Sequence, residues 1–118
     1  MSSLPSPLPD ALVELIAHQF RVLGEPSRIK LLDVLRSGAA TGADLQTATG
    51  FSQQNVSKHL GILLEAGMVR RVKEGNRAFY SIADERLFDL CDQICGTLRR
   101  QVTQLEALLL PLEGEPAR

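Results

Sequence analysis

The chain has 118 residues, of which 44% are hydrophobic, and a formal net charge of −1. This length suits one domain that is small enough for a second copy to help bury apolar surface, so we expect a homodimer. No apolar run approaches the roughly 18 residues of a membrane-spanning helix, and no signal peptide opens the chain, so we expect a cytoplasmic protein without a membrane partner. Two cysteines are too few for a disulfide framework, so we expect free thiols.

A single folded domain is predicted over residues 10–110. Residues 1–9 are rich in Pro and Ser and predict a flexible N-terminal tail, and residues 111–118 predict a second tail at the C-terminus. Most of the domain is expected to be helical. We therefore predict a mainly α, α+β fold with long terminal helices.

Three helices are expected in the first half of the domain. The first covers residues 10–23 and is broken by Gly24-Glu25-Pro26, and Pro26 suits the first turn of a second helix over residues 26–36. Gly38 ends that helix. Residues 41–49 form a short third helix, and Gly50 provides the turn into the next one, which gives the order of a helix-turn-helix.

The fourth helix begins after Ser52, a plausible N-cap, and ends at Gly67, which suits the left-handed position beyond a helix. At about 100° per residue, one side collects apolar residues and the other collects polar ones. The apolar side holds Val56, Leu60, Leu63 and Ala66, and the opposite side holds Gln54, Ser57, Lys58 and Gly61. Amide, hydroxyl and ammonium groups of this kind suit contacts in a major groove, although any solvated helix face contains them.

A basic hairpin follows directly. Residues 68–73 and 77–82 are β-rich runs joined by Glu74-Gly75-Asn76, a turn of the hairpin type. Residues 52–83 carry five Lys and Arg against two Asp and Glu, whereas residues 1–51 carry four against five and residues 84–118 carry four against seven. A basic segment between two acidic segments favours DNA binding through that segment alone, and we expect the affinity for DNA to fall as the salt concentration rises.

These patterns predict a winged helix-turn-helix with a two-stranded β wing and double-stranded DNA as partner. The candidate DNA-binding residues are Ser52, Gln53, Gln54, Asn55, Ser57, Lys58 and His59 on the helix, and Arg70, Arg71, Lys73 and Arg77 on the wing.

The chain resembles the ArsR/SmtB family of bacterial winged-helix regulators. The resemblance rests on FRVLGEPSRIKLLDVL, on SQQNVSKHLGILLEAGMVRRVKEGNRAFYSI, and on a long final helix after Asp84. It implies a homodimer formed by the first and last helices, operator binding by two winged helices, and release of DNA by an inducer. In that dimer the shared core would contain Leu12, Leu15, Ile16, Leu87, Leu90, Ile94, Leu98 and Leu105.

The metal sites of the best-known members are not matched. Where arsenic sensors carry Cys-x-Cys before Asp-Leu, this chain has Thr41-Gly42-Ala43, which offers no thiolate. The positions that match the zinc ligands of the last helix are Asp84, Arg86, Thr97 and Arg100, and the two arginines cannot ligate zinc. The histidines, His18 and His59, are expected to be structural. No cofactor is certain.

Cys91 and Cys95 are the remaining sensor candidates. They lie four residues apart in the last helix, with Cys91 in its apolar stripe and Cys95 at the edge. Either they pack in a dimer interface as small apolar groups, or their thiolates bind a metalloid or metal ion or form a regulatory disulfide between subunits. Both alternatives stay open.

An enzyme is not expected. The spacing Cys91-x-x-x-Cys95 is not that of a dithiol oxidoreductase, and neither a phosphate-binding loop nor an acid/base pair is present. The predicted function is a homodimeric transcriptional repressor that an inducer releases. The alternatives are a DNA-binding regulator with structural cysteines and no metal site, and a winged helix used as a protein-interaction module.

Overall fold

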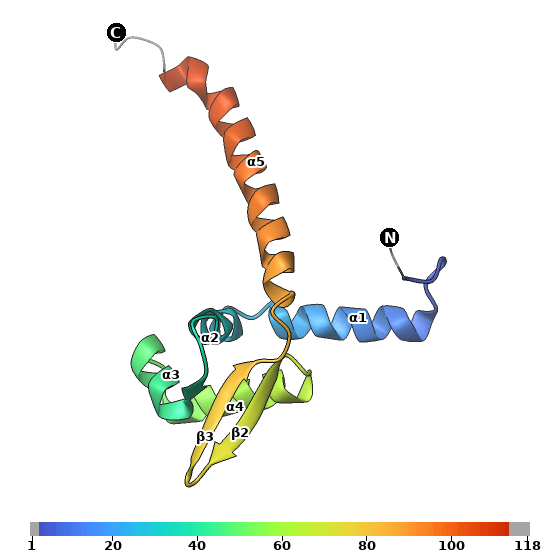
Figure 1. Ribbon diagram of the computed structural model, residues 1–118. Helices are drawn as coiled ribbons and strands as arrows, with labels where there is room; N and C mark the ends of the chain where they lie inside the picture. Colours follow the sequence, from blue (N-terminus) through green and yellow to red (C-terminus); the bar gives the residue numbers. More distant parts are fainter. Residues whose placement is uncertain (1–2, 114–118) are drawn as a thin grey trace. The chain divides into compact units, whose positions relative to one another are not determined.

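The computed structural model describes residues 3–113. These residues form two compact units, of which the first ends at Asp84 and the second begins at Glu85. The first unit contains helices α1 to α4 and a small sheet, and the second is formed by one long helix, α5 (Figure 1). The fold is therefore mainly helical, as predicted. Within residues 3–113, no helix combines the length and apolarity needed to cross a membrane.

Helices α1 (Asp10–Leu23) and α2 (Pro26–Leu35) begin where the sequence predicts. Pro26 occupies the first turn of α2, where its missing N–H costs nothing. The carboxylate of Glu25 caps this helix by accepting a hydrogen bond from the backbone N–H of Arg28 (3.2 Å). Arg36, which the prediction included in the helix, is its C-cap residue.

The segment before the third helix contains a strand that the sequence prediction missed. Strand β1 (Ala40–Thr41) pairs with a later strand, and helix α3 (Gly42–Thr49) begins one residue later than predicted. The Thr41 hydroxyl accepts from the Asp44 N–H (3.1 Å), while the Asp44 carboxylate accepts from the Thr41 N–H (3.0 Å). This capping box fixes the start of α3.

Helix α4 (Gln53–Glu65) has both predicted boundaries. The Ser52 hydroxyl accepts from the Asn55 N–H (3.1 Å), which confirms the N-cap. At the other end Gly67 has φ of +75°, and the Met68 N–H donates to the Leu63 carbonyl (2.9 Å). This is a Schellman motif, which satisfies carbonyls that the helix leaves unpaired.

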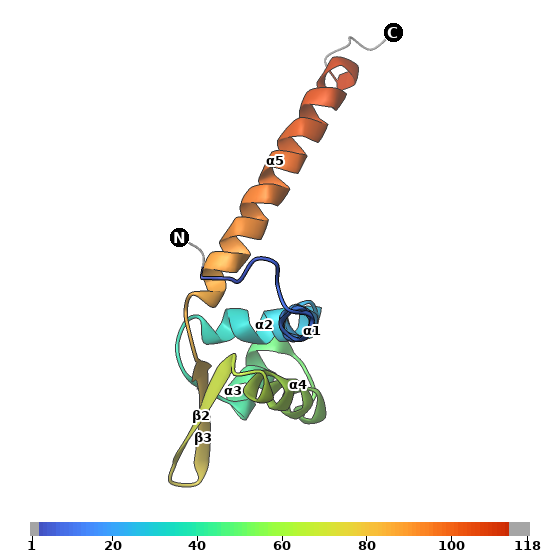
Figure 2. The ribbon, with the colours of Figure 1, turned by 90° about the vertical axis from the view of Figure 1, so that its right-hand side faces the viewer.

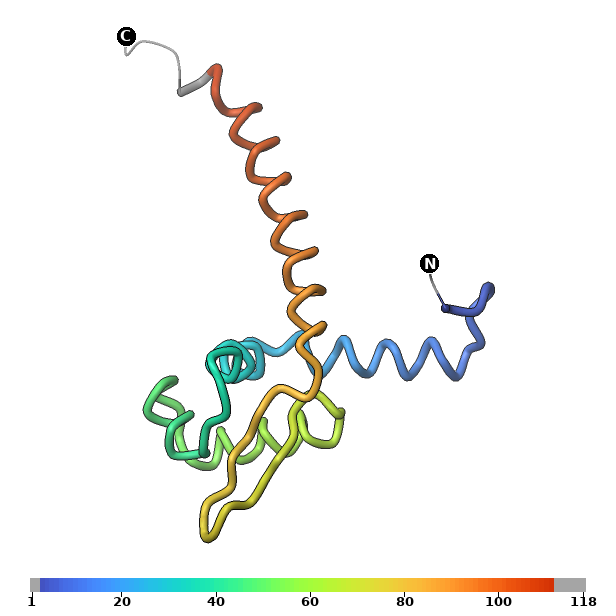
Figure 3. The backbone as a smooth tube through the Cα atoms, viewed as in Figure 1, coloured from blue at the N-terminus to red at the C-terminus, as the bar shows by residue number. Residues whose placement is uncertain are grey.

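Strands β2 (Val69–Glu74) and β3 (Arg77–Ile82) form the predicted wing. The backbone leaves α4 and enters this hairpin directly, and its tip extends beyond α3 and α4 (Figures 2 and 3). The antiparallel sheet has the order β1-β3-β2, so the wing has a third, short strand. The turn contains two residues, Gly75 and Asn76, because Glu74 pairs with Arg77; φ of Gly75 is +62°.

The core of the first unit lies where α2, α3 and α4 meet. Leu31, Leu45 and Leu63, one from each helix, are completely buried. The other buried apolar residues are Val22, Leu23, Leu32, Leu35, Ala40, Val56, Leu60 and Val69. The apolar side of α4 is thus held by packing, which leaves its polar side in solvent.

Helix α5 (Leu87–Glu113) has 27 residues. It contains Pro111 and extends three residues beyond the predicted boundary at residue 110; residues 114–118 of the predicted C-terminal tail lie outside the described part of the chain. Within the single chain its apolar stripe is 42–56% exposed at Ile94, Leu98, Val102, Leu105 and Leu109.

Candidate nucleic-acid interface

The polar side of α4 is accessible along its first two turns. All of the predicted base-reading and phosphate-binding side chains except His59 are exposed: Ser52, Gln53, Gln54, Asn55, Ser57 and Lys58. Val56, Leu60 and Leu63 are buried on the other side, as the periodicity predicts. The amides of Gln and Asn can pair bidentately with adenine, and Lys58 can contact phosphate.

The turn before α4 is held by local contacts. Gly50 has φ of +76°, which suits glycine, and the Phe51 N–H donates to the Thr49 hydroxyl (3.2 Å). The Lys30 ammonium lies 5.9 Å from the centre of the Phe51 ring, so a cation–π contact also joins α2 to this turn. These contacts fix how α4 follows α3.

The strand register separates the basic residues of the wing. Arg71 lies opposite Tyr80 and Lys73 opposite Ala78, so these two cations share a face. Arg70 lies opposite Ser81, on the alternate face, and its guanidinium donates to the Ala83 carbonyl (2.8 Å). Arg71 and Lys73 are therefore the freer pair for phosphate binding.

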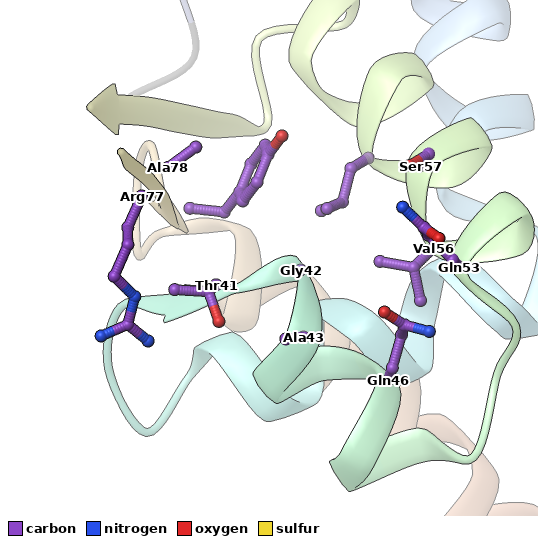
Figure 4. Close-up of a pocket in the computed structure, with 11 residues that line it drawn as sticks. Thr41, Gly42, Ala43, Gln46, Gln53, Val56, Ser57, Arg77 and Ala78 are labelled. Atoms are coloured by element: carbon purple, nitrogen blue, oxygen red, sulfur yellow. The ribbon is translucent and has the colours of Figure 1, made fainter. Parts of the chain in front are cut away.

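A hollow of about 360 Å³ lies between the start of α3, α4 and β3 (Figure 4). Its polar lining includes Gln46, Gln53, Ser57 and Arg77. Gln46 was not among the predicted site residues, because no motif distinguishes it from any other polar residue of a short helix. The Arg77 guanidinium also lies 5.2 Å from the centre of the Phe79 ring. The hollow thus joins three helix side chains to the first residue of β3, beside the turn of the wing.

Asp44 at the edge of this region is held as a carboxylate. The Thr41 N–H and then the Thr41 hydroxyl lower its pKa, and the positive charge of Arg77 lowers it further. The two positions at which arsenic sensors carry thiolates are occupied by Thr41 and Ala43, and the Thr41 hydroxyl forms the capping box of α3 with the Asp44 carboxylate. Both groups are already used in holding the helix.

His59 does not belong to the exposed surface that its predicted contact with DNA would require. Its residue exposure is 6%, and its ring lies against the start of α2. Nδ1 is 3.1 Å from Nη1 of Arg28, and Nε2 is 3.8 Å from Oε2 of Glu25. The helical period places His59 beside Leu63 of the packed side, in agreement with its burial and with the structural role expected for the histidines.

Cys91 and Cys95 are free thiols in α5, the first half-exposed and the second exposed within the single chain. In the described residues no three His, Cys, Asp or Glu side chains gather as a possible metal site. At the positions of the zinc ligands in the family, the Arg100 guanidinium donates to the Thr97 hydroxyl (3.3 Å).

Known proteins resemble this chain in sequence over the same region. A family model described as a helix-turn-helix domain matches residues 23–72. A probable mercury resistance operon repressor of Streptomyces lividans is 39% identical over 74 residues, which are 63% of this chain and 59% of that protein. The chain thus spans less than two thirds of that relative. The HTH-type transcriptional regulator Rv0081 of Mycobacterium tuberculosis is 32% identical over 106 residues, covering 89% of this chain and 93% of Rv0081.

Solved structures show the same architecture. The crystal structure of Rv0081 matches with a TM-score of 0.74 and 30% identity, over 81% of this chain and 97% of that chain. The solution structure of the homodimeric winged helix-turn-helix domain of Mb0332 from Mycobacterium bovis, a possible ArsR-family regulator, matches with a TM-score of 0.68 and 30% identity, over 81% and 91% of the two chains.

Proposed function

The chain belongs to the ArsR/SmtB family of winged-helix transcriptional regulators, which is not a family of enzymes, and from this membership we propose that it is a homodimeric repressor of operator DNA. The observation that carries the proposal is the exposed polar face of α4 beside a basic wing. In this role α4 lies in the major groove while the wing follows the backbone.

The proposed contacts divide by chemistry. Gln53, Gln54 and Asn55 read base edges through their amides, since these groups pair bidentately with adenine. Ser52, Ser57 and Lys58 contact bases or phosphates, and Arg71 and Lys73 bind the phosphate backbone. Arg70 and Arg77 lie on the other face of the wing and approach the phosphate backbone from there. His59 is left out because it is buried.

The proposed dimer uses the exposed apolar residues of α5, together with those of α1. In α1, Leu15 is 65% exposed in the single chain, and Val13 and Phe20 are also exposed. Large exposed apolar surfaces mark interaction sites, and the related Mb0332 domain is homodimeric. A dimer would set the spacing of two recognition helices to match two half-sites of one operator.

Salt dependence tests the phosphate contacts. We expect Lys58→Ala and Arg71→Ala each to weaken binding to a DNA fragment from upstream of the gene. Each should also reduce the slope of log affinity against log salt by about 2, because the homodimer loses one phosphate contact from each subunit. Fluorescence anisotropy at several salt concentrations measures both effects. Arg99→Ala, an equal loss of charge on α5, is the control and should leave the slope unchanged. Unchanged slopes in all three variants would contradict the proposed DNA face.

We further propose that Cys91 and Cys95 sense a thiophilic metalloid or an oxidant. Their free, partly exposed thiols on neighbouring turns support this role. The mercury and arsenical resistance repressors among the relatives support it as well. Because the described part of one chain gathers no third ligand, an ion that requires more than two thiolates would take the others from the second subunit. The alternative is that both thiols only pack in the dimer interface.

Release of DNA by thiol reagents distinguishes these alternatives. Arsenite or a mild oxidant should release the reduced wild-type protein from its fluorescent DNA fragment, and Cys91→Ser should bind DNA without responding. Thr97→Ser is a matched control on the same helix and should respond like the wild type. Tight wild-type binding that neither reagent changes would make the cysteines structural.

A further inference from the structure

A polar cluster around the buried His59 joins the recognition helix to the start of α2. Arg28 is its centre: Nε donates to the Val22 carbonyl (2.6 Å), Nη2 donates to the Arg21 carbonyl (3.4 Å), and Nη1 lies 3.1 Å from Nδ1 of His59. Arg28 therefore ties the C-terminal end of α1 to a side chain of α4. His59 directly follows Lys58, a proposed DNA contact.

The chemistry of this contact fixes the protonation state of His59. A guanidinium has donors and no acceptor, so Nδ1 of His59 must accept the hydrogen bond from Arg28. The imidazole is then neutral, with its proton on Nε2, which points toward the Glu25 carboxylate 3.8 Å away. If Nδ1 gained a proton, this hydrogen bond would be lost and two cations would face each other.

We infer that the neutral His59 positions the recognition helix on α2 through Arg28, and that uptake of a proton by His59 weakens DNA binding. The inference rests on the proposed function. It makes His59 and Arg28 positioning residues that act on DNA through the placement of α4. No contact of either residue with DNA is required.

The charges around His59 act in both directions. Burial lowers its pKa most; the negative charge of Glu25 raises it, and the positive charges of Arg28 and Lys58 lower it. The result is a pKa below the ordinary value of 6.5. Among the described residues, no charge from α3 or the wing acts on the ring. His18 and Arg21 of α1 and Glu65 of α4 line a neighbouring hollow together with Arg28.

The direction of the pH effect follows from this lowered pKa. An unfolded chain takes up the His59 proton as pH falls through about 6.5, while the folded chain resists until a lower pH. The stabilisation contributed by neutral His59 is therefore fully present above about pH 6.5, and it is lost as pH falls through the lower pKa of the folded chain. DNA affinity follows protonation of the folded protein, so it should be constant above about pH 6.5 and decrease as pH falls toward the lowered pKa of folded His59.

A pH profile of DNA affinity at constant ionic strength tests the inference. Between about pH 7.5 and about pH 5.5 the wild-type affinity for the upstream fragment should fall about threefold to tenfold. His59→Asn places a carbonyl acceptor near the position of Nδ1 but takes up no proton, so it should bind at the higher pH and lose most of the decrease. His18→Gln removes the other histidine and should keep the wild-type profile.

The possible results separate the inference from the proposed function. Equal decreases in the wild type and His59→Asn would overturn the inference alone, whereas no specific binding by any variant at the higher pH would overturn the proposed function and the inference with it. Nitrogen-15 NMR of the wild-type imidazoles gives a second measurement that needs no variant. It should show His59 neutral at pH about 7 with its proton on Nε2; a charged ring or a proton on Nδ1 would overturn the inference.

Discussion

Replacement of Leu105 by glutamate is expected to convert the protein to a monomer and to lower its affinity for operator DNA at least about 100-fold. Leu105 lies in the C-terminal half of the apolar stripe of α5 and is 56% exposed in the single chain. A carboxylate there would have to be buried against the partner's apolar surface, which is costly. A monomer also loses the second half-site, and with it the gain from linked binding.

The neighbouring residue provides a matched control for this variant. Gln104 is exposed and lies about 100° around the helix from Leu105, outside the stripe. Gln104→Glu introduces the same charge and should leave a dimer with unchanged affinity. Sedimentation equilibrium gives the mass and anisotropy gives the affinity. A dimeric Leu105→Glu variant that binds DNA normally would show that α5 does not form the interface.

Replacement of Leu63 by alanine should lower the free energy of unfolding by about 2–5 kcal/mol. Leu63 is completely buried, at the point where the apolar side of α4 meets α2 and α3. Its truncation removes buried methyl groups and leaves a cavity that the helices cannot fully close. Urea unfolding followed by circular dichroism measures the change at one fixed protein concentration, since dimerisation makes stability depend on concentration.

A substitution on the exposed side of the same helix should instead raise the free energy of unfolding. A methyl group added at Gly61 would meet no atom within 4 Å, so the alanine side chain would not clash with the rest of the protein. Alanine is favoured over glycine inside a helix, and this variant should be more stable by about 0.5–1 kcal/mol. A Leu63→Ala variant as stable as the wild type would contradict the assignment of the buried side of α4.

The main features of the DNA-binding unit could be predicted because they have local causes. The Ser52 hydroxyl caps α4 and Gly67 ends it, and both effects depend on neighbours in the sequence. The wing was predicted from its β-rich runs and its Gly-Asn turn, with an error of one residue in β2. The turn shifted because Glu74 pairs across the hairpin with Arg77.

The features that were missed depend on contacts between distant residues. Strand β1 has two residues, too few for an alternating pattern, and exists because it pairs with β3. The periodicity of α4 correctly separated Val56 from Ser57, but it could not show that Arg28 and Glu25 would lie against His59. Gln46 joins the candidate site because α3 is packed beside α4. Sequence spacing along one element contains no information of this kind.

Hydroxyl-radical footprinting of the DNA upstream of the gene tests most directly whether the protein is a dimeric reader of an operator. A homodimer with two recognition helices should protect two segments whose centres are separated by one helical turn, about 10 base pairs, or by a multiple of it. The two segments should also be related by approximate two-fold symmetry in their sequence. A single protected segment, or uniform weak protection without a preferred site, would contradict the account.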